Sequence, residues 1–266
     1  SIDRSGDVTF YLDTLNIGTA DISQFNGQNI SNTDEFTIGA WKGNATSFIN
    51  GTMDDIRLFP AALSPEEVVS IFNNDDAPQP NPVAHWENDE GSGSSTADVS
   101  GNGNNGTLYN NPAWTTGISS NAISFDGVND YVDCGTSTDL DIETGDFSIS
   151  TWIKMGSSQS SNPTIVAKGA GASYDTGYWL LWNNYKLRVY LSDGSSRVAF
   201  DSDVITIDDD TWHHIAVTIN RNNDLVFYVD GVNAGSVDVS AHAGKDLSST
   251  KSFTFGSWQS SSNSFL

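Results

Sequence analysis

The sequence predicts an all-β protein in which two sheets pack into a β-sandwich, with one short helix near the end of a domain. Several segments alternate between apolar and polar residues with a period of two, which is typical of half-buried strands. Glycine is frequent, at 24 of 266 residues, and the predicted strands are short and separated by turns. These features argue against a coiled coil or a bundle of long helices.

Four segments show the strand pattern most clearly. They span residues 147–154, 187–191, 212–219 and 225–229. Asp230 and Gly231 follow the last of them and predict a type I′ hairpin turn, in which both central residues need a positive φ. Asp13 and Thr14 stand at the corresponding place near the start of the chain and suit that turn less well.

One helix is predicted after Ser64, which is a favourable N-cap residue. Pro65 suits the first helical position, and Glu67 at the third completes a capping box with Ser64. Acidic residues also suit the positive end of the helix dipole. The apolar stripe of this helix consists of Val68, Val69, Ile71 and Phe72.

The chain repeats itself at a spacing of 217 residues. Residues 1–49 align with residues 218–266 without a gap, and 19 of the 49 pairs are identical. The segment VTFYLD aligns with LVFYVD, and FTIGAW aligns with FTFGSW. Because a period of this length corresponds to a whole domain, the sequence predicts a tandem array, of which this chain holds about 1.2 units.

A proline-rich segment separates the two predicted units. Residues 75–82 hold three of the seven prolines, which predicts a stiff and extended linker. We therefore expect residues 1–74 to be the C-terminal part of one repeat. Residues 83–266 would form the next repeat and lack its final strand or strands. A sheet that lacks a strand exposes an open edge, which recruits a strand from a neighbour.

The charge and the cysteine content exclude several classes of partner and site. The formal net charge is −23 and the isoelectric point about 4.1. So acidic a surface repels nucleic-acid phosphates and anionic lipid headgroups. We therefore predict no nucleic-acid partner and no membrane insertion, since no apolar run approaches the roughly 20 residues of a membrane span. A single cysteine, Cys134, allows neither an internal disulfide nor a cysteine-based zinc site.

A series of short blocks follows a fixed order along the chain. The blocks lie at residues 84–93, 98–107, 122–132, 147–153, 212–217 and 227–231, and a closing block at 50–64 occurs only in the first copy. Each block is weak alone, but the ordered set covers nearly the whole chain and resembles the laminin-G-like, concanavalin A-like lectin/glucanase superfamily in its bacterial tandem form. The resemblance implies an antiparallel jelly-roll that is extracellular, often calcium-bound, and binding or adhesive rather than catalytic.

The loop that begins at Asp98 is the best candidate for a metal site. Asp98, Ser100 and Asn102 place oxygen-bearing side chains at alternate positions before a glycine, as in the opening of a calcium loop, and Asn104 follows. Tyr109 stands at position twelve, where an EF-hand has glutamate, so a carboxylate has to come from elsewhere. The alternative is a turn-rich loop in which Asx side chains cap their own backbone.

Three residues are candidates for the missing carboxylate. The resemblance implies that Asp54 and Asp55 lie near this loop, and Asp126 is a further possibility. Bound Ca²⁺ would then hold loops and strand ends together. However, Asp54 and Asp55 belong to the earlier predicted unit and Asp98 to the later one. Alternatively, Asp54, Asp55 and Arg57 form a surface ion network that contributes little to stability.

Aromatic residues near position 180 are candidate glycan contacts. Tyr178 and Trp182 share one face of a predicted strand, and Tyr185 follows. These rings could form a platform on which a sugar stacks. The alternative is that they fill the core, as aromatic residues often do in sandwiches.

No catalytic residues are predicted. The acidic run at residues 87–90 leads into Gly-Ser-Gly, which predicts a loop of solvated acids rather than the paired carboxylates of a glucanase. His213 and His214 point to opposite faces of a strand, so both cannot bind one metal from there. Residues 101–106 match a dinucleotide-binding pattern, but no helix follows them.

These observations together predict a non-enzymatic repeat of a large extracellular surface protein, acting as a structural or adhesive module of a fibre or adhesin and stabilised by calcium. Its predicted partners are copies of itself or neighbouring repeats, through strand completion and head-to-tail assembly, together with glycans. The alternative functions are a carbohydrate-binding lectin-type module and, more remotely, a glycoside hydrolase.

Overall fold

The computed structural model describes residues 7–12, 15–21, 36–38, 49–73, 81–157, 162–169 and 175–256. The predicted turn at Asp13 and Thr14 and most of the linker lie outside the described residues. The described residues contain no helix with the length and hydrophobicity that a membrane span requires.

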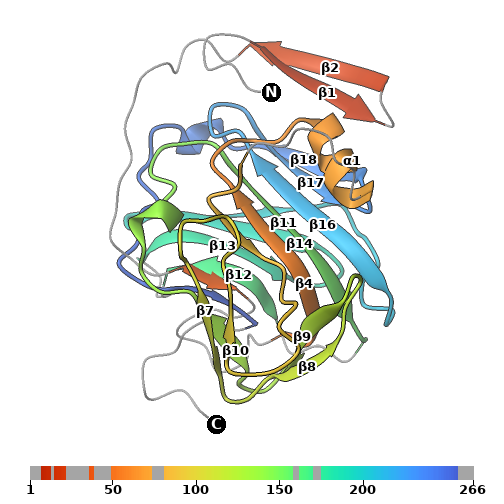
Figure 1. Ribbon diagram of the computed structural model, residues 1–266. Coiled ribbons are helices and arrows are strands. Elements are labelled where there is room, and N and C mark those ends of the chain that lie inside the picture. Colours follow the sequence, from red (N-terminus) through yellow and green to blue (C-terminus); the bar gives the residue numbers. More distant parts are fainter. Residues whose placement is uncertain are drawn as a thin grey trace.

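The described chain folds into two large sheets that face each other, as the sequence predicts, with one short α-helix on the outside (Figure 1). The first sheet contains β3 (Phe36–Ile38), β6 (Ser95–Thr96), β7 (Gly106–Tyr109), β10 (Tyr131–Asp133), β12 (Thr164–Lys168), β13 (Thr176–Trp182), β14 (Leu187–Asp193), β15 (Arg197–Asp201) and β19 (Phe253–Phe255). The second contains β4 (Asn50–Phe59), β5 (Ala84–Trp86), β8 (Ala113–Thr116), β9 (Asn121–Asp126), β11 (Phe147–Met155), β16 (Trp212–Ile219), β17 (Asp224–Val229) and β18 (Val232–Asp238).

The strands of the first sheet lie in the order β15-β14-β13-β12-β19-β3-β10-β7-β6. Those of the second sheet lie in the order β18-β17-β16-β11-β4-β9-β8, and β5 pairs with β4. A separate two-stranded sheet consists of β1 (Asp7–Leu12) and β2 (Leu15–Asp21). Within the described ranges, short 3₁₀ helices span Thr138–Leu140 and Ser240–His242. The four strands predicted most clearly from the sequence are confirmed as β11, β14, β16 and β17.

The predicted turn and helix signals are also confirmed. Asp230 and Gly231 have φ values of 51° and 77°, as a type I′ turn requires. Helix α1 (Pro65–Asn73) begins with the capping box, in which the Ser64 N–H donates to Glu67 Oε2 at 2.6 Å and the Glu67 N–H donates to Ser64 Oγ at 3.2 Å. Its apolar side packs on the second sheet in a small cluster of Phe59, Leu63, Val68, Ile71, Ala216, Val226 and Tyr228.

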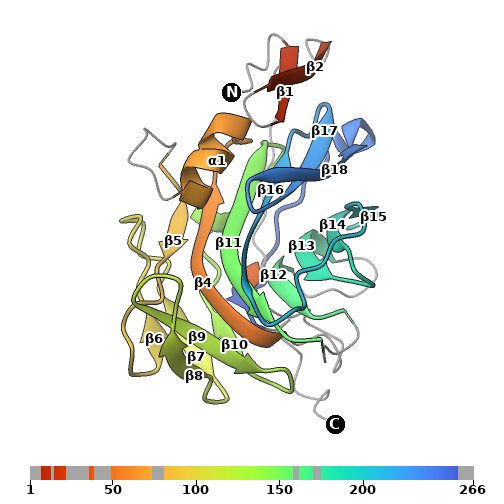
Figure 2. The same cartoon turned by 90° about the vertical axis from the view of Figure 1, so that its right-hand side faces the viewer.

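Strand β4 lies in the middle of the second sheet, between β11 and β9 (Figure 2). It pairs with β11 from Gly51 to Phe59, with β9 through its first four residues, and with β5 from Ile56 to Leu58. All the other strands of this sheet follow the proline-rich segment in the sequence. A strand from before the linker therefore occupies a central position in a sheet built by residues after it.

The elements in the two repeated parts of the sequence have the same bounds after a shift of 217 residues. Strands β1, β2 and β3 correspond in this way to β17, β18 and β19. The hairpins also share their register, since Asp7 pairs with Asp21 as Asp224 pairs with Asp238, and each hairpin has its irregularity at the corresponding place. The repeated sequence thus folds into the same local structure twice.

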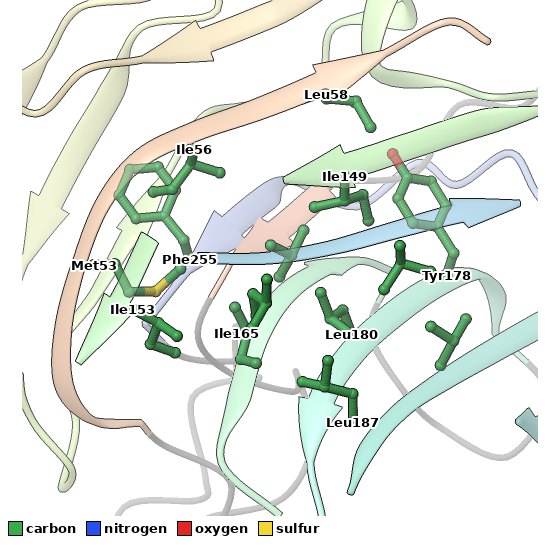
Figure 3. Packing of buried hydrophobic residues seen from close by; sticks show 14 of the residues in the cluster. Met53, Ile56, Leu58, Ile149, Ile153, Ile165, Tyr178, Leu180, Leu187 and Phe255 are labelled. Atoms are coloured by element: carbon green, nitrogen blue, oxygen red, sulfur yellow. The ribbon is translucent and has the colours of Figure 1, made fainter. Parts of the chain in front are cut away.

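The hydrophobic core lies between the two large sheets (Figure 3). From the second sheet, Met53, Ile56 and Leu58 of β4 and Ile149 and Ile153 of β11 point into it. They meet Ile165, Tyr178, Leu180, Leu187 and Phe255 of the first sheet. Burying each large side chain stabilises the fold by about 1.5–3 kcal/mol, so the segment that carries β4 contributes strongly to a core formed mainly by later residues.

Candidate ligand-binding pocket

A pocket of about 340 Å³ lies on the face of the second sheet that carries α1. Five separate parts of the chain form it: β4, the end of α1, the loop after β5, the loop between β8 and β9, and β11. Its lining residues are Asp54, Asp55, Arg57, Phe72, Glu87, Asp89, Ile118, Ser119 and Trp152. The volume is at the small end of the range of about 300–1,000 Å³ that is usual for small-ligand sites.

A β-bulge in β4 explains why two consecutive aspartates line the same pocket. The pairing of β4 with β11 is irregular between Ser150 and Trp152, and Asp55 takes a φ of 48° there. In a regular strand, neighbouring side chains point to opposite faces, whereas a bulge redirects one of them. Trp152 is the direct cross-strand partner of Asp54, so their side chains are neighbours on one face of the sheet.

Asp54 is a buried carboxylic acid, with only 2% of its surface exposed. Its Oδ2 atom accepts a hydrogen bond from the Ile118 N–H at 2.9 Å. The pKa of Asp54 is raised to about 7, because burial and, to a smaller extent, the nearby charge of Asp55 outweigh the opposing hydrogen bonds from the backbone N–H groups of residues 118, 119 and 55. Near neutral pH, this side chain can therefore act as either a hydrogen-bond donor or an acceptor.

Gly117 allows the β8–β9 loop to approach Asp54 closely. A Cβ atom at this position would lie 2.3 Å from Asp54 Oδ2 and 2.4 Å from the backbone oxygen of Asn121. Both distances are far below a normal contact, so any larger residue would push the loop away from the carboxylate. The glycine thus permits the hydrogen bond between Ile118 and Asp54.

Asp55 is held by two basic partners. Arg57 donates from Nε and Nη2 to both carboxylate oxygens at 2.8 Å, and His85 Nε2 lies 2.7 Å from Oδ1. Burial alone would raise the pKa of Asp55. The hydrogen bonds and charges of His85 and Arg57 have a larger effect in the opposite direction, so the pKa of Asp55 lies below its usual value. An ion pair between Asp55 and Arg57 thus exists, as part of the alternative ion network considered from the sequence, and it fixes the Arg57 guanidinium at the pocket.

Two aromatic rings form the apolar wall of the pocket. Phe72 of α1 stacks on Trp152 of β11 with ring centroids 5.7 Å apart. His214 of β16 packs behind both rings, 5.4 Å from Trp152 and 6.1 Å from Phe72. Among the described residues, neither ring nitrogen of His214 has a hydrogen-bond partner, and burial lowers the pKa of His214 to about 4. The histidine is therefore neutral and acts as a packing residue.

The acidic run at residues 87–90 forms a loop, as expected, but its residues are not simply solvated. Asp89 Oδ1 accepts the Asn121 N–H at 2.9 Å, and the Asp89 backbone oxygen accepts from Asn121 Nδ2 at 3.0 Å. Glu90 Oε1 accepts the Ala97 N–H at 2.7 Å. These bonds fix the loop so that Glu87 and Asp89 line the pocket.

The Asp98 loop has a different arrangement, in which one carboxylate organises its own surroundings. Asp98 Oδ1 accepts the N–H groups of His85 and Ser100, and Oδ2 accepts the N–H and the side-chain amide of Asn104, at 2.9–3.2 Å. Ser100, Asn102 and Asn104 also donate side-chain hydrogen bonds to the Val83 backbone oxygen. Burial alone would raise the pKa of Asp98. The hydrogen bonds to this carboxylate have a larger effect in the opposite direction, so the pKa of Asp98 lies below its usual value.

The predicted calcium ligands are not gathered around one point. Asp98, Ser100, Asn102 and Asn104 share a loop, and Asp55 reaches that region only through His85. In the described ranges, no group of three or more His, Cys, Asp or Glu residues could hold a metal ion. Both Asp98 oxygens face N–H donors, which does not fit a calcium ligand. Calcium binding therefore stays a prediction without support from this geometry.

Asp126 also serves a turn rather than the Asp98 loop. Its Oδ1 accepts the N–H groups of Val128, Asn129 and Asp130 at 2.8–3.4 Å. Asp130 packs next to it, and burial together with the Asp126 charge raises the pKa of Asp130 to about 6. The loop at residues 101–106 leads into strand β7, in agreement with the prediction that it is no dinucleotide-binding motif.

The predicted aromatic platform is corrected by the structure. Tyr178 and Trp182 are 1% and 4% exposed and belong to the core, so neither ring can stack on a sugar. Their strand, β13, is covered on both of its faces, because every residue from Gly177 to Trp182 is buried, so the apolar run leaves no solvent face. Tyr185 is the one predicted platform residue with an exposed ring, at 58%.

The sequence did not reveal that Trp152, Phe72 and the 118–119 loop form a site. Trp152 occupies an outward position of an alternating strand, which is unusual for so large an apolar residue. This outward position was the feature of the sequence that could have indicated a binding site. The Asp54–Asp55 pair was noticed, but as a metal candidate. The partners of these residues come from segments up to 98 positions away, as Asp54 and Trp152 show.

Comparison with known proteins gives one family and distant structural similarities. The family model described as the concanavalin A-like lectin/glucanases superfamily matches residues 1–69 and 126–266. The binding domain of Paraclostridial Mosquitocidal Protein 1 is similar at 18% identity and a TM-score of 0.49, over 60% of this chain and 41% of that one. The receptor binding domain of botulinum neurotoxin mosaic serotype C/D is similar at 17% identity and a TM-score of 0.41, over 59% and 38%. This chain thus spans less than half the length of these structures. No curated protein matches it.

Proposed function

Since the chain belongs to the concanavalin A-like lectin/glucanase superfamily, we propose that it is a non-enzymatic binding module that attaches its parent protein to glycans. The observation that supports this most is the pocket beside α1, in which an aromatic wall faces several fixed hydrogen-bonding groups. A sugar ring presents an apolar face and a rim of hydroxyl groups. Trp152 and Phe72 would contact the face, while the carboxylates and the Arg57 guanidinium would bind the hydroxyls.

The charge of the pocket and of the chain favours a neutral glycan. Four of the nine lining residues are acidic, and one is basic. The net charge of −23 would repel sialylated, sulfated or uronic-acid glycans over distances of about 8 Å at physiological salt. Neutral hexoses and amino sugars fit the acidic lining better, because their hydroxyl and amino groups can donate to carboxylates.

The state of the carboxylates supports binding rather than hydrolysis. Asp55 is neutralised by Arg57 and His85, and Asp54 is directed at the backbone of the β8–β9 loop. Asp55 is thus held in an ion pair, and Asp54 uses one of its oxygens to accept the Ile118 N–H, whereas a glycosidase needs two carboxyl groups that flank the scissile bond. We also propose, from the sequence, that the parent protein is an extracellular adhesin or fibre composed of tandem repeats.

A glycan array tests the proposal. The wild-type chain should bind neutral glycans, and Trp152→Ala should lose up to about tenfold in affinity, because stacking on an aromatic ring contributes roughly 0.5–1.5 kcal/mol. Tyr185→Ala is the matched control, since it removes an exposed aromatic ring outside the pocket. The proposal fails if the wild type binds no glycan, or if Trp152→Ala binds as tightly as Tyr185→Ala does.

A further inference from the structure

A second pocket of about 320 Å³ lies at the start of β4. It is formed by the first residues of β4, the end of β11 with the two residues that follow it, and the loop before β16. Hydroxyl, amide, ammonium and carboxylate groups line it, and such groups can donate to or accept from the hydroxyl groups of a sugar. The polar residues of this lining are Asn50, Thr52, Lys154, Ser157 and Asp210.

The register between β4 and β11 places the second pocket next to the pocket beside α1, on one face of the sheet. Ile153 of β11 points into the core (Figure 3), so Trp152 and Lys154, its neighbours along the strand, point outward. Asp54 and Thr52 are the cross-strand partners of these two residues and face the same way. Alternate residues of a strand are roughly 7 Å apart, so the two pairs lie that far from each other.

Strand β16 adds a second tryptophan to this surface. Trp212 is the direct cross-strand partner of Lys154, just as His214 is the partner of Trp152. Because the Cβ atoms of such partners are about 4.5–5.5 Å apart, the Trp212 side chain lies beside that of Lys154 on the outward face. Trp212 and Lys154 are both half-buried, so each keeps surface that a ligand can contact.

The outward face thus presents an aromatic ring and hydrogen-bonding groups twice in succession. Trp152 stands beside Asp54 in the first pocket, and Trp212 stands beside Lys154 at the second. The two tryptophans are diagonal neighbours on adjacent strands, and such neighbours are about 7–8 Å apart. This spacing allows two consecutive rings of one oligosaccharide to contact one tryptophan each.

The two pockets differ in the state of their basic residue. Arg57 in the first pocket is paired with Asp55. Among the described residues, by contrast, the Lys154 ammonium has no carboxylate partner. Its N–H groups therefore remain available to donate to the oxygen atoms of a ligand. The second pocket also holds one acidic and one basic residue, which suits a neutral ligand.

We propose that the two pockets are successive subsites for one neutral oligosaccharide of at least two units, with one ring at Trp152 and the next at Trp212 and Lys154. This inference rests on the proposed function, because it assigns the length of the glycan. The lining residues on β4 run from Asn50 to Arg57, which corresponds to roughly 20 Å of strand. A monosaccharide is shorter than this and would leave one pocket unfilled.

Calorimetry with a length series tests the proposal. The probes are neutral saccharides of one to four units composed of glucose, galactose, mannose or N-acetylglucosamine. For the series that binds, the tetrasaccharide should bind more tightly than the monosaccharide by roughly two- to tenfold, which is the contribution of a contact with one further aromatic ring. A longer chain also has more ways to occupy a single pocket, so variants have to locate the gain.

Trp212→Ala and Lys154→Ala should each reduce the ratio of tetrasaccharide to monosaccharide affinity. Trp152→Ala should instead lower the affinity for saccharides of every length, because the first pocket binds all of them. Lys186→Ala is the matched control for charge, since it removes a lysine between β13 and β14, outside both pockets. This control should keep the wild-type ratio. Binding of the monosaccharide shows that each variant is folded.

The outcomes separate this inference from the proposed function. If no series binds to wild type, the proposed glycan binding is wrong and the two subsites are wrong with it. If a series binds with equal affinity at every length, glycan binding stands and the second subsite is refuted. The second subsite is also refuted if Trp212→Ala and Lys154→Ala both keep the ratio of the Lys186→Ala control.

Discussion

The Asp98 loop and the Asp54 pocket use buried carboxylates in opposite ways. Asp98 accepts four hydrogen bonds from its own loop and the adjacent strand, and its pKa is lowered. Asp54 accepts mainly from the 118–119 loop, lies beside another carboxylate, and has a pKa of about 7. The difference shows that Asp98 stabilises the fold by its charge, whereas charging Asp54 costs stability at a position where a ligand can bind.

The largest expected effect is at Asp98. Replacing Asp98 by alanine leaves the N–H groups of His85, Ser100 and Asn104 without an acceptor in a mostly buried loop. Each such group costs about 1–3 kcal/mol, so the free energy of unfolding should fall by about 4 kcal/mol. Urea denaturation monitored by tryptophan fluorescence measures this change.

Asp126→Ala is the control for that loss. Asp126 also accepts three backbone N–H groups, but in an exposed turn where water can replace it. We expect the Asp126 variant to lose less than about half as much stability as Asp98→Ala. Equal losses would show that burial of the Asp98 loop does not increase the cost of losing its hydrogen bonds. That result would contradict the structural role of the Asp98 carboxylate.

The next effect is at Asp54 and depends on pH. The folded protein holds the Asp54 proton up to a pKa of about 7, while the unfolded chain releases it near 3.8. The contribution of Asp54 to the free energy of unfolding is therefore fully present at low pH and is lost as pH rises from about 4 to 7. Asp54→Asn removes the charge, so we expect it to be more stable than wild type by about 3 kcal/mol at pH 8 and by little at pH 4.

Denaturation curves for the two proteins at several pH values check this prediction. The difference in unfolding free energy between variant and wild type should grow steadily across the window. A difference that does not change with pH would mean that Asp54 is charged in the folded protein at all of these values. That outcome would remove the distinction between the two carboxylates.

His214 should show the opposite pH dependence in the same part of the molecule. Its pKa is about 4 when folded and 6.5 when unfolded, so the unfolded chain binds more protons between these values. The contribution of His214 to the free energy of unfolding is fully present above pH 6.5 and falls as pH decreases towards 4. His214→Phe keeps an aromatic ring at the position that contacts Trp152 and Phe72, and it should resist acid better, by about 2 kcal/mol at pH 4.5. An unchanged acid transition would show that His214 is not buried as a neutral group.

The smallest expected effect is that of calcium. Because the Asp98 oxygens already accept four hydrogen bonds, we expect Ca²⁺ or EDTA to change the melting temperature by less than about 2 °C, equivalent to roughly 0.5 kcal/mol. Calorimetry of the protein with and without Ca²⁺ measures the shift. A stabilisation of several degrees that Asp98→Ala abolishes would restore the loop as a metal site.

The parts of the structure that depend on neighbouring residues in the sequence were predictable. The alternation in residues 147–154, the Ser64–Glu67 capping box and the Asp230-Gly231 turn each specify their own conformation. The place of β4 and the pocket could not be derived in this way. They depend on a bulge at Asp55 and on contacts between Asp54 and Ile118, 64 residues apart. Tyr178 and Trp182 show the same limit, since periodicity does not distinguish a fully buried strand from one with a solvent face.

Calorimetric titration of the best neutral glycan at pH 5.5 and pH 8 tests most directly whether the pocket around Asp54 is the ligand site. If the ligand contacts this carboxyl group, wild-type affinity should change with pH around the Asp54 pKa of about 7, and Asp54→Asn should bind with an affinity that does not depend on pH. Asp98→Ala, studied at a temperature where it is folded, should keep the wild-type pH dependence. The same pH dependence in Asp54→Asn as in wild type, or none in either, would contradict the account.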